Sequence, residues 1–158
     1  MNDEHVAAVR QGAKGISKWR DENGGNNGVY FDLENANLSG ADLRNANLRG
    51  ARFVSANLRG ADFGNANLRS ADFGNANLKS ASLAAANLSG ANLKNANLRN
   101  ANLRNANLMN TSLENASLVD ADLSGADFGN ADLRNANLKS ANLENTNLEN
   151  ANLENANL

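Results

Sequence analysis

The sequence predicts an all-β solenoid, a square β-helix of about six 20-residue coils, preceded by a short capping α-helix. Three observations predict it. Every fifth residue from Leu33 to Leu158 is Leu or Phe, 22 being Leu and four Phe. Ala stands two places before 23 of these 26 residues. Aromatic residues make up only 4% of the 158 residues, so a regular aliphatic stack must replace an ordinary hydrophobic core.

The five-residue period fits neither standard secondary structure. On an α-helix, five residues advance by about 500°, which would scatter the leucines around every side. On a flat strand, an odd period would place successive leucines on opposite faces. The leucines all stay inside only if the chain turns by about 90° in each repeat, so that four repeats close a square coil and coils stack about 4.8 Å apart.

The turn residues support this arrangement. Phe63, Phe73 and Phe128 are each followed by Gly-Asn. A type II turn needs a positive φ at its second central residue, a conformation that glycine adopts without strain. We therefore expect these glycines to supply the positive φ. Elsewhere Asn dominates, a residue that tolerates left-handed conformations and can stack its side-chain amides in ladders.

With this repeat, Ala-(Asn/Asp)-Leu-X-(Asn/Gly/Ser), the sequence resembles the pentapeptide-repeat family, whose repeat is written A(D/N)LXX. The resemblance covers residues 31–158. It implies a right-handed quadrilateral β-helix, a handedness that the spacing alone does not give. Most members of this family have no known biochemical activity, so the resemblance implies none for this chain. A minority of the family, the quinolone-resistance type, binds DNA gyrase by resembling duplex DNA.

Residues 1–28 carry no repeat and are expected to cap the repeat domain, residues 29–158. Their apolar residues follow the three-and-four spacing of one short amphipathic helix: Val6, Val9, Ala13, Ile16 and Trp19. Val6, Val9, Ile16 and Trp19 are expected to cover the first coil. Residues 24–28 form a break rich in Gly and Asn, and residues 29–31 are expected to lead into the first coil in an extended conformation. The segment resembles the helical leader of many cyanobacterial repeat proteins. A helix that binds a partner independently is the alternative.

The sequence contains few candidate catalytic residues. It contains no Cys and a single His, His5, which we expect to be solvated in a frayed terminus. Asp42 and Asp62 are expected to stack one coil apart, but no other acid, cleft or cofactor loop accompanies them. We therefore predict no enzyme activity, no cofactor, no metal site and no small-molecule substrate.

A 20-residue coil places residues 20 apart in the same outward column. One column alternates in charge through Lys94, Glu114, Arg134 and Glu154. Another places Arg52 between Asp32 and Asp72, which explains the one basic residue at that repeat position. Exposed ion pairs contribute only about 0–1 kcal/mol each, so these columns are expected to set register more than stability.

A third column is basic without such an explanation. It reads Ser39, Arg59, Lys79, Arg99, Val119 and Lys139. Two interpretations remain open: the long side chains spread into solvent at little cost, or they form a linear stripe that binds an acidic partner or a phosphate backbone. Arg59, Lys79, Arg99 and Lys139 are therefore candidate partner-binding residues.

Charge also changes along the chain. Residues 32–105 contain nine Lys/Arg and five Asp/Glu, whereas residues 106–158 contain two and eight. The last coil carries Glu144, Glu149 and Glu154, and nothing in the sequence covers its leucines. These glutamates are expected either to oppose end-to-end association or to form an acidic docking face. We expect a monomer, or a weak dimer through this end.

These observations predict a non-enzymatic scaffold that presents a rod-shaped surface to a protein partner of unknown identity. The alternative is a DNA-mimic modulator of DNA gyrase or a related topoisomerase. Basic residues follow eight of the first fifteen Leu or Phe positions, which argues against mimicry of a polyanion. The net charge of −2 makes nucleic acid an unlikely partner. Neither a signal peptide nor a membrane span is expected, which favours the cytoplasm.

Overall fold

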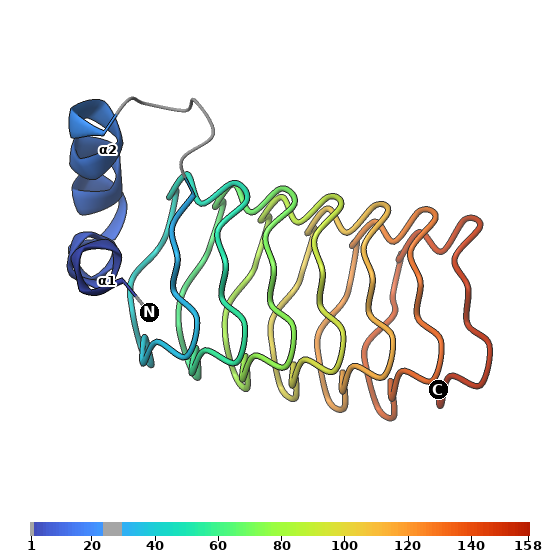
Figure 1. The fold of residues 1–158 in the computed structure, drawn as a ribbon. Coiled ribbons are helices and arrows are strands. Elements are labelled where there is room, and N and C mark those ends of the chain that lie inside the picture. Colours follow the sequence, from blue (N-terminus) through green and yellow to red (C-terminus); the bar gives the residue numbers. More distant parts are fainter. Residues whose placement is uncertain (1, 24–29) are drawn as a thin grey trace.

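The computed structural model describes residues 2–23 and 30–158 of the chain. Two helices, α1 (Asp3–Arg10) and α2 (Gly12–Glu22), lie across one end of a rod of stacked coils (Figure 1). The coils advance from the helix-covered end to the C-terminal end in chain order. The Gly/Asn-rich break and the start of the extended lead-in fall outside the described residues.

The N-terminal segment forms two helices where the sequence predicted one. Asn2 caps α1, because its Oδ1 accepts the N–H groups of Glu4 and His5 at 3.1 and 3.4 Å. The helical path is interrupted at Gln11, between α1 and α2. Gly12 has a φ of +68°, which lets the chain turn sharply into α2. The apolar spacing continues through this break, which is why periodicity alone indicated a single helix.

The rod has the predicted 20-residue register. Parallel bridges join residues 20 apart, as in Asp32 to Arg52 and Arg52 to Asp72. Leu33 N–H donates to the Arg52 carbonyl at 2.8 Å, and Arg52 N–H donates to the Phe31 carbonyl at 2.8 Å. In the described part these are isolated bridges rather than strands, because a turn follows within every five residues.

The square coil has four sides, which we number from the first coil. Side 1 carries Leu33, side 2 Leu38, side 3 Leu43 and side 4 Leu48, and each side recurs every 20 residues. We call the described repeats the rod (residues 30–158) and the described N-terminal segment the cap (residues 2–23).

The core of the rod is the predicted stack of Leu, Phe and Ala. Leu98 is fully buried and Ala96 is 1% exposed, and the same pattern holds in the coils around them. Phe53 and Phe73 stack one coil apart with ring centroids 4.8 Å apart. Thr111 replaces Ala in the interior, and its hydroxyl donates to the Leu108 carbonyl at 2.6 Å. The substitution therefore leaves no unsatisfied hydroxyl in the core.

The turns need a left-handed residue, as expected, but glycine does not supply it after phenylalanine. In Phe63-Gly64-Asn65 the positive φ, 57°, belongs to Asn65, the second central residue of the turn. Gly64 instead donates its N–H to Asp62 Oδ1 at 2.9 Å, and a Cβ at Gly64 would lie 3.2 Å from that oxygen. Glycine permits the shorter bond here, because Arg44 and Arg134 make the same contact with Asp42 and Asp132 at 3.2 Å. Gly74 and Gly129 repeat this arrangement.

Candidate functional site

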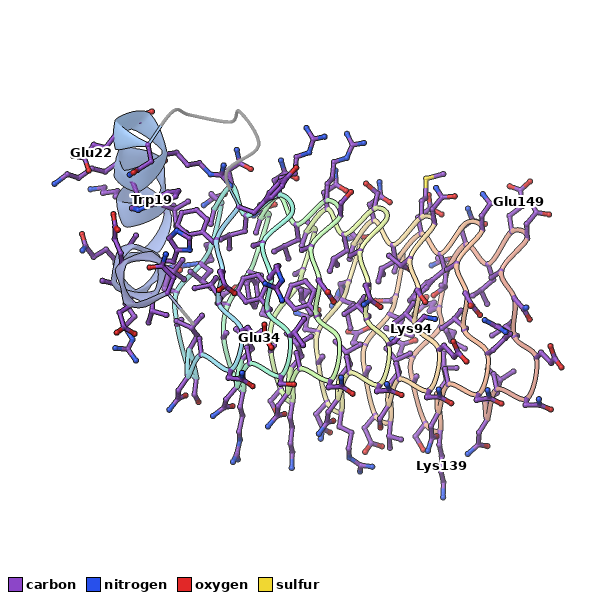
Figure 2. All side chains as sticks on the ribbon, viewed as in Figure 1. Trp19, Glu22, Glu34, Lys94, Lys139 and Glu149 are labelled. Carbon is purple, nitrogen blue, oxygen red and sulfur yellow. The ribbon has the colours of Figure 1, made fainter. Side chains whose placement is uncertain are left out.

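The cap covers the first coil with its apolar residues. Val9 and Ile16 are fully buried, and Val6 and Trp19 are 6% and 7% exposed. All four belong to the same apolar cluster as Phe31 and the leucines of the rod. Figure 2 shows Trp19 reaching from α2 toward the first coil. These contacts close the N-terminal end of the core.

The cap also satisfies the open backbone edge of the first coil, which the sequence did not predict. In later coils each of these carbonyls accepts a leucine N–H from the preceding coil. In the first coil, Asp32 accepts from Asn2 N–H at 3.4 Å, Asn37 from Arg10 Nη2 at 3.3 Å and Asn47 from Arg20 Nε at 3.1 Å. Polar groups of the cap therefore replace a missing coil on sides 1, 2 and 4.

On side 3 the backbone of the cap comes close to the first coil at Gly12. A Cβ at Gly12 would lie 2.9 Å from the Asp42 carbonyl oxygen. Glycine at this position therefore permits both the break between the helices and their close seat on the rod. Because single contacts of this kind leave no periodic signal, sequence reasoning had no means of finding them.

His5 is buried in this interface, so the expectation of a solvated histidine was wrong. It is 8% exposed, and its Nδ1 accepts the Asp32 N–H at 2.8 Å. Its ring meets the rings of Trp19 and Phe31 edge-on, at centroid distances of 4.6 and 5.4 Å. Burial lowers the pKa of His5 below 6.5, although the charges of Asp32 and Glu4 oppose that shift. A neutral His5 is the form that this hydrogen bond requires.

The stacked carboxylates Asp42 and Asp62 are neutralised by an arginine. Arg44 donates from Nε and Nη2 to both carboxylate oxygens of Asp42, at 2.9 and 2.6 Å, and its Nε lies 3.7 Å from Asp62 Oδ2. Hydrogen bonding to Arg44 lowers the pKa of Asp42 to about 2. A carboxylate held in its charged form in this way is a poor general acid or base at neutral pH.

A cleft opens where the cap meets the rod. This cleft of about 580 Å³ lies between the helix junction and side 3, and its charged residues are Arg10, Lys14, Asp42 and Arg44. Arg44 already holds the one carboxylate among them. Residues 2–23 and 30–158 contain no cluster of His, Asp and Glu suited to a metal ion. In the same ranges, no helix is long and apolar enough to cross a membrane.

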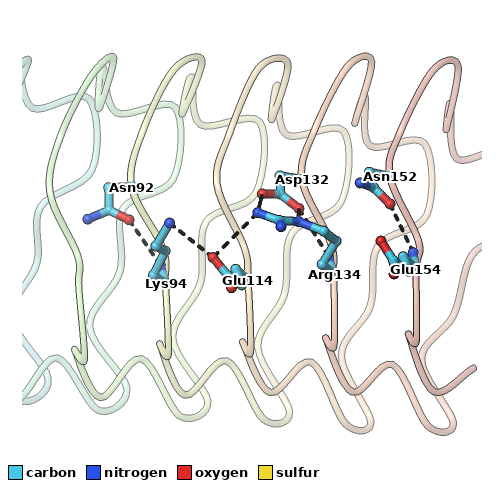
Figure 3. A network of polar contacts seen from close by, with 7 residues as sticks. All are labelled: Asn92, Lys94, Glu114, Asp132, Arg134, Asn152 and Glu154. Carbon is cyan, nitrogen blue, oxygen red and sulfur yellow. Dashed lines mark hydrogen bonds and ion pairs between the residues drawn. The ribbon is translucent and has the colours of Figure 1, made fainter.

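Side 1 carries the predicted ladder of alternating charge (Figure 3). Glu114 Oε2 lies 3.0 Å from Lys94 Nζ and 3.6 Å from Arg134 Nη2. Arg134 also forms a two-pronged contact with Asp132, at 2.8 and 2.7 Å, which lowers the pKa of the Asp132 carboxyl. Lys94, Glu114, Arg134 and Asp132 are therefore paired within the rod itself, whereas Glu154 forms no ion pair with the described residues.

Arg52 lies between Asp32 and Asp72, as predicted, and it forms an ion pair with Asp32 and a shorter one with Glu34. Its Nη2 donates to Glu34 Oε2 at 2.8 Å, while its Nη1 lies 3.7 Å from Asp32 Oδ1. Asp72 instead accepts from Asn92 Nδ2 at 2.8 Å. The register of the column was correct, but the long arginine side chain reaches diagonally to the residue beside the column.

Side 2 carries the basic column, which we call the basic stripe: Arg59, Lys79, Arg99 and Lys139. The N–H of each stripe residue donates to the side-chain oxygen of the Asn two places before it, at 3.1–3.3 Å. Arg99 Nη2 lies 3.6 Å from Asp120 Oδ2. Within the described ranges, the side chains of Arg59, Lys79 and Lys139 have neither an ion pair nor a hydrogen bond. Figure 2 shows Lys139 projecting away from the rod.

The three candidate glutamates lie around the last coil and do not share one surface. Glu144 is on side 3, Glu149 on side 4 and Glu154 on side 1, and all three are exposed. Leu143, Leu148 and Leu153 of the same coil are partly buried, and Leu158 is 69% exposed. Association through this coil stays a prediction.

Comparison with known proteins places this geometry in a family. The profile of the pentapeptide repeat region matches residues 76–158, and that of pentapeptide repeats in eight copies matches residues 32–65. Profiles therefore match more than half of the chain. No curated protein shows significant similarity to it.

Solved structures of repeat proteins resemble the rod. Rfr23, from the cyanobacterium Cyanothece 51142, is 38% identical over 61% of this chain and 63% of its own, with a TM-score of 0.52. A protein of the Arabidopsis thaliana thylakoid lumen is 32% identical over 66% of this chain and 69% of its own, with a TM-score of 0.51. HetL of Nostoc, titled as involved in heterocyst differentiation regulation, is 35% identical over 80% and 65%, with a TM-score of 0.37. The chain thus spans less than two thirds of the length of Rfr23 and HetL.

Proposed function

Because this chain belongs to the pentapeptide-repeat family, whose members fold as right-handed quadrilateral β-helices, we propose that it is a non-enzymatic scaffold that binds a protein partner through the basic stripe. One observation carries the proposal. Side 2 presents cations on successive coils, and three of the four lack an ion pair among the described residues. Charges that the rod leaves unneutralised are available to an acidic partner.

The geometry of side 2 supports this choice. Beside the stripe, the outward column reads Asn37, Asn57, Asn77, Asn97, Ser117, Asn137 and Asn157. This column contains no carboxylate, and the turn column of side 2 contains one, Asp120. The potential over this side is therefore positive, whereas the cations of side 1 face acidic neighbours in their own ladder. The acidic residues of the last coil point in three directions and offer no comparable single face.

Modulation of DNA gyrase by DNA mimicry is the second candidate that the family suggests. A surface that imitates duplex DNA needs negative charge along most of the rod. Here residues 32–105 carry a net charge of +4, from nine basic and five acidic residues. We therefore expect the purified protein to leave gyrase supercoiling unchanged, and inhibition at micromolar concentration would replace the stripe proposal with the mimic.

The stripe offers a matched control. Arg49 and Arg69 occupy the same repeat position on side 4, in two consecutive coils that each lie one coil before those of Arg59 and Lys79 on side 2. Both are exposed, and neither has an ion pair within the described ranges. The double variants R59E/K79E and R49E/R69E therefore change the net charge equally at equivalent places on opposite sides of the square.

The test is affinity capture from an extract of the source organism with the wild type and both variants as bait. The proposal predicts a protein that is retained by the wild type and by R49E/R69E and is lost with R59E/K79E. Circular dichroism of each bait verifies that the rod is folded. Loss with both variants, or retention by both, contradicts binding through the basic stripe.

A further inference from the structure

The basic stripe has a defined spacing along the rod axis. Parallel bridges join Asn57 to Asn77 and Asn77 to Asn97, so neighbouring stripe residues lie about 4.8 Å apart. Val119, 7% exposed, occupies the fourth position, and Lys139 occupies the fifth. Along the axis the pattern is therefore three cations, one apolar residue and one cation.

The backbone fixes these positions. The carbonyl of Lys79 accepts the Gly60 N–H at 3.0 Å, and that of Arg99 accepts the Ser80 N–H at 2.9 Å. The carbonyl of Lys139 accepts the Asp120 N–H at 3.0 Å. Together with the asparagine bond at each N–H, these contacts hold every stripe residue from both sides. Only the side chains are free to adjust, so a partner meets a ladder of constant pitch.

We infer that the partner, if the scaffold proposal holds, presents an acidic α-helix that lies lengthwise along the basic stripe. Helix positions i, i+3, i+7, i+10 and i+14 share one face, at about 0, 4.5, 10.5, 15 and 21 Å. The five stripe positions lie at about 0, 4.8, 9.6, 14.4 and 19.2 Å. Every mismatch is below about 2 Å, within reach of a flexible Lys or Arg side chain.

The inferred helix carries Asp or Glu at i, i+3, i+7 and i+14. It carries an uncharged residue at i+10, opposite Val119, because a carboxylate there would meet no cation. An extended strand fits less well. Its same-face residues are about 6.7 Å apart, so its third carboxylate would overshoot Arg99 by about 4 Å.

Single-stranded nucleic acid fits less well for a different reason. Proteins that bind it commonly combine basic grooves with aromatic rings on which bases stack. The outward columns of side 2, read from residue 37 to residue 157, contain Asn, Ser, Gly, Asp, Val, Arg and Lys and no aromatic residue. Side 2 therefore offers charge and amide groups at a helical pitch, but no surface for stacking.

The experiment measures the fluorescence anisotropy of two labelled, hydrocarbon-stapled 17-residue peptides with the full chain. The matched peptide has Glu at positions 1, 4, 8 and 15 and Ala at position 11. The scattered peptide has the same composition, with its four Glu distributed around the helix. We expect the matched peptide to bind about tenfold more tightly, as several weak exposed ion pairs would give. R59E/K79E should abolish this preference, whereas R49E/R69E should change affinity less than about twofold.

Equal affinity for the two peptides would overturn the helix inference, as would an equal loss with both variants. Tighter binding of a 12-nucleotide oligo-dT would assign the stripe to nucleic acid instead. The two proposals fail separately. If R59E/K79E loses the captured protein while the peptides bind alike, the scaffold proposal stands and the helix does not. If the capture shows no dependence on the stripe, the scaffold proposal itself fails.

Discussion

Backbone carbonyls of the coils accept different kinds of donor within the rod and beneath the cap. In the rod, Leu33 N–H donates to the Arg52 carbonyl at 2.8 Å, and this bond recurs 20 residues later and on every side. In the cap, the equivalent carbonyls of the first coil receive a guanidinium from Arg10, another from Arg20 and the N–H of Asn2. The rod repeats one backbone hydrogen bond in every coil, whereas each of the cap's hydrogen bonds to these carbonyls occurs once.

This difference has a consequence for stability. A contact that recurs in every coil couples each coil to its neighbours, so the rod should unfold as a cooperative stack. The polar contacts of the cap given above all fall on residues 32–47 of the first coil, so the cap should be able to open while the rod stays folded. Trp19 is the only tryptophan of the chain and lies in the cap interface. Its fluorescence therefore reports on the cap, whereas circular dichroism reports on the rod once the helical signal of α1 and α2 is subtracted.

The largest effect is expected in the rod. Leu98→Ala should lower the free energy of unfolding by about 2–5 kcal/mol, because Leu98 is fully buried in a stack with little room to collapse. Arg99→Ala, one residue away but outward-facing, should cost less than about 1 kcal/mol. Denaturant melts followed by circular dichroism measure both. Equal losses would contradict the inward and outward assignment.

A matched change in the cap should act locally. Ile16 is as fully buried as Leu98, yet Ile16→Ala should leave the circular dichroism melt unchanged within about 1 kcal/mol. The fluorescence transition of Trp19 should move to lower denaturant, since the lost contacts hold only the cap. A parallel shift of both transitions would show that cap and rod unfold as one unit.

Acid should release the cap before it affects the rod. His5 has a lowered pKa when the cap is docked, so the undocked cap binds a proton more readily. Docking should be independent of pH well above 6.5. It should weaken as pH falls below 6.5, by up to about 1.4 kcal/mol per unit, until the docked pKa is passed. Denaturant titrations of Trp19 fluorescence at pH 7.5 and 5.0 measure this loss.

The control for this prediction is His5→Gln, whose amide oxygen is able to accept the Asp32 N–H without titrating. In this variant, the denaturant midpoint of the Trp19 fluorescence transition should be the same at pH 7.5 and at pH 5.0. An equal pH dependence in the variant would assign the effect to another group.

The smallest effect concerns surface charge on the rod. Arg52→Asp should destabilise more than Arg49→Asp, by about 1 kcal/mol or less. The first change removes the contact with Glu34 and places a third carboxylate beside Glu34 and Asp32. The second change creates no such cluster. The difference should shrink at high salt. Matching melting temperatures at low salt would contradict the column assignment.

What could be predicted from the sequence follows the same division. The 20-residue register, the buried Leu and Ala positions and the side 1 ladder all follow from one constraint that acts in every repeat. The packing of the cap on the first coil depends on contacts of single side chains such as His5 and Arg20. No repeated pattern in the sequence indicates these contacts. Glu34 was missed as a partner of Arg52 because the long arginine side chain reaches beyond its own column. The positive φ was misplaced because Gly-Asn offers two residues that tolerate it.

Lysine reactivity tests the central claim most directly, because the five lysines sample separate surfaces. Lys79 and Lys139 belong to the basic stripe, Lys94 lies on side 1, and Lys14 and Lys18 lie in α2. Acetylation of each is measured by mass spectrometry with and without the captured partner. The account predicts several-fold protection of Lys79 and Lys139, with Lys94, Lys14 and Lys18 unchanged. Protection of Lys94 or of the cap lysines, with Lys79 and Lys139 as reactive as in the free protein, would contradict it.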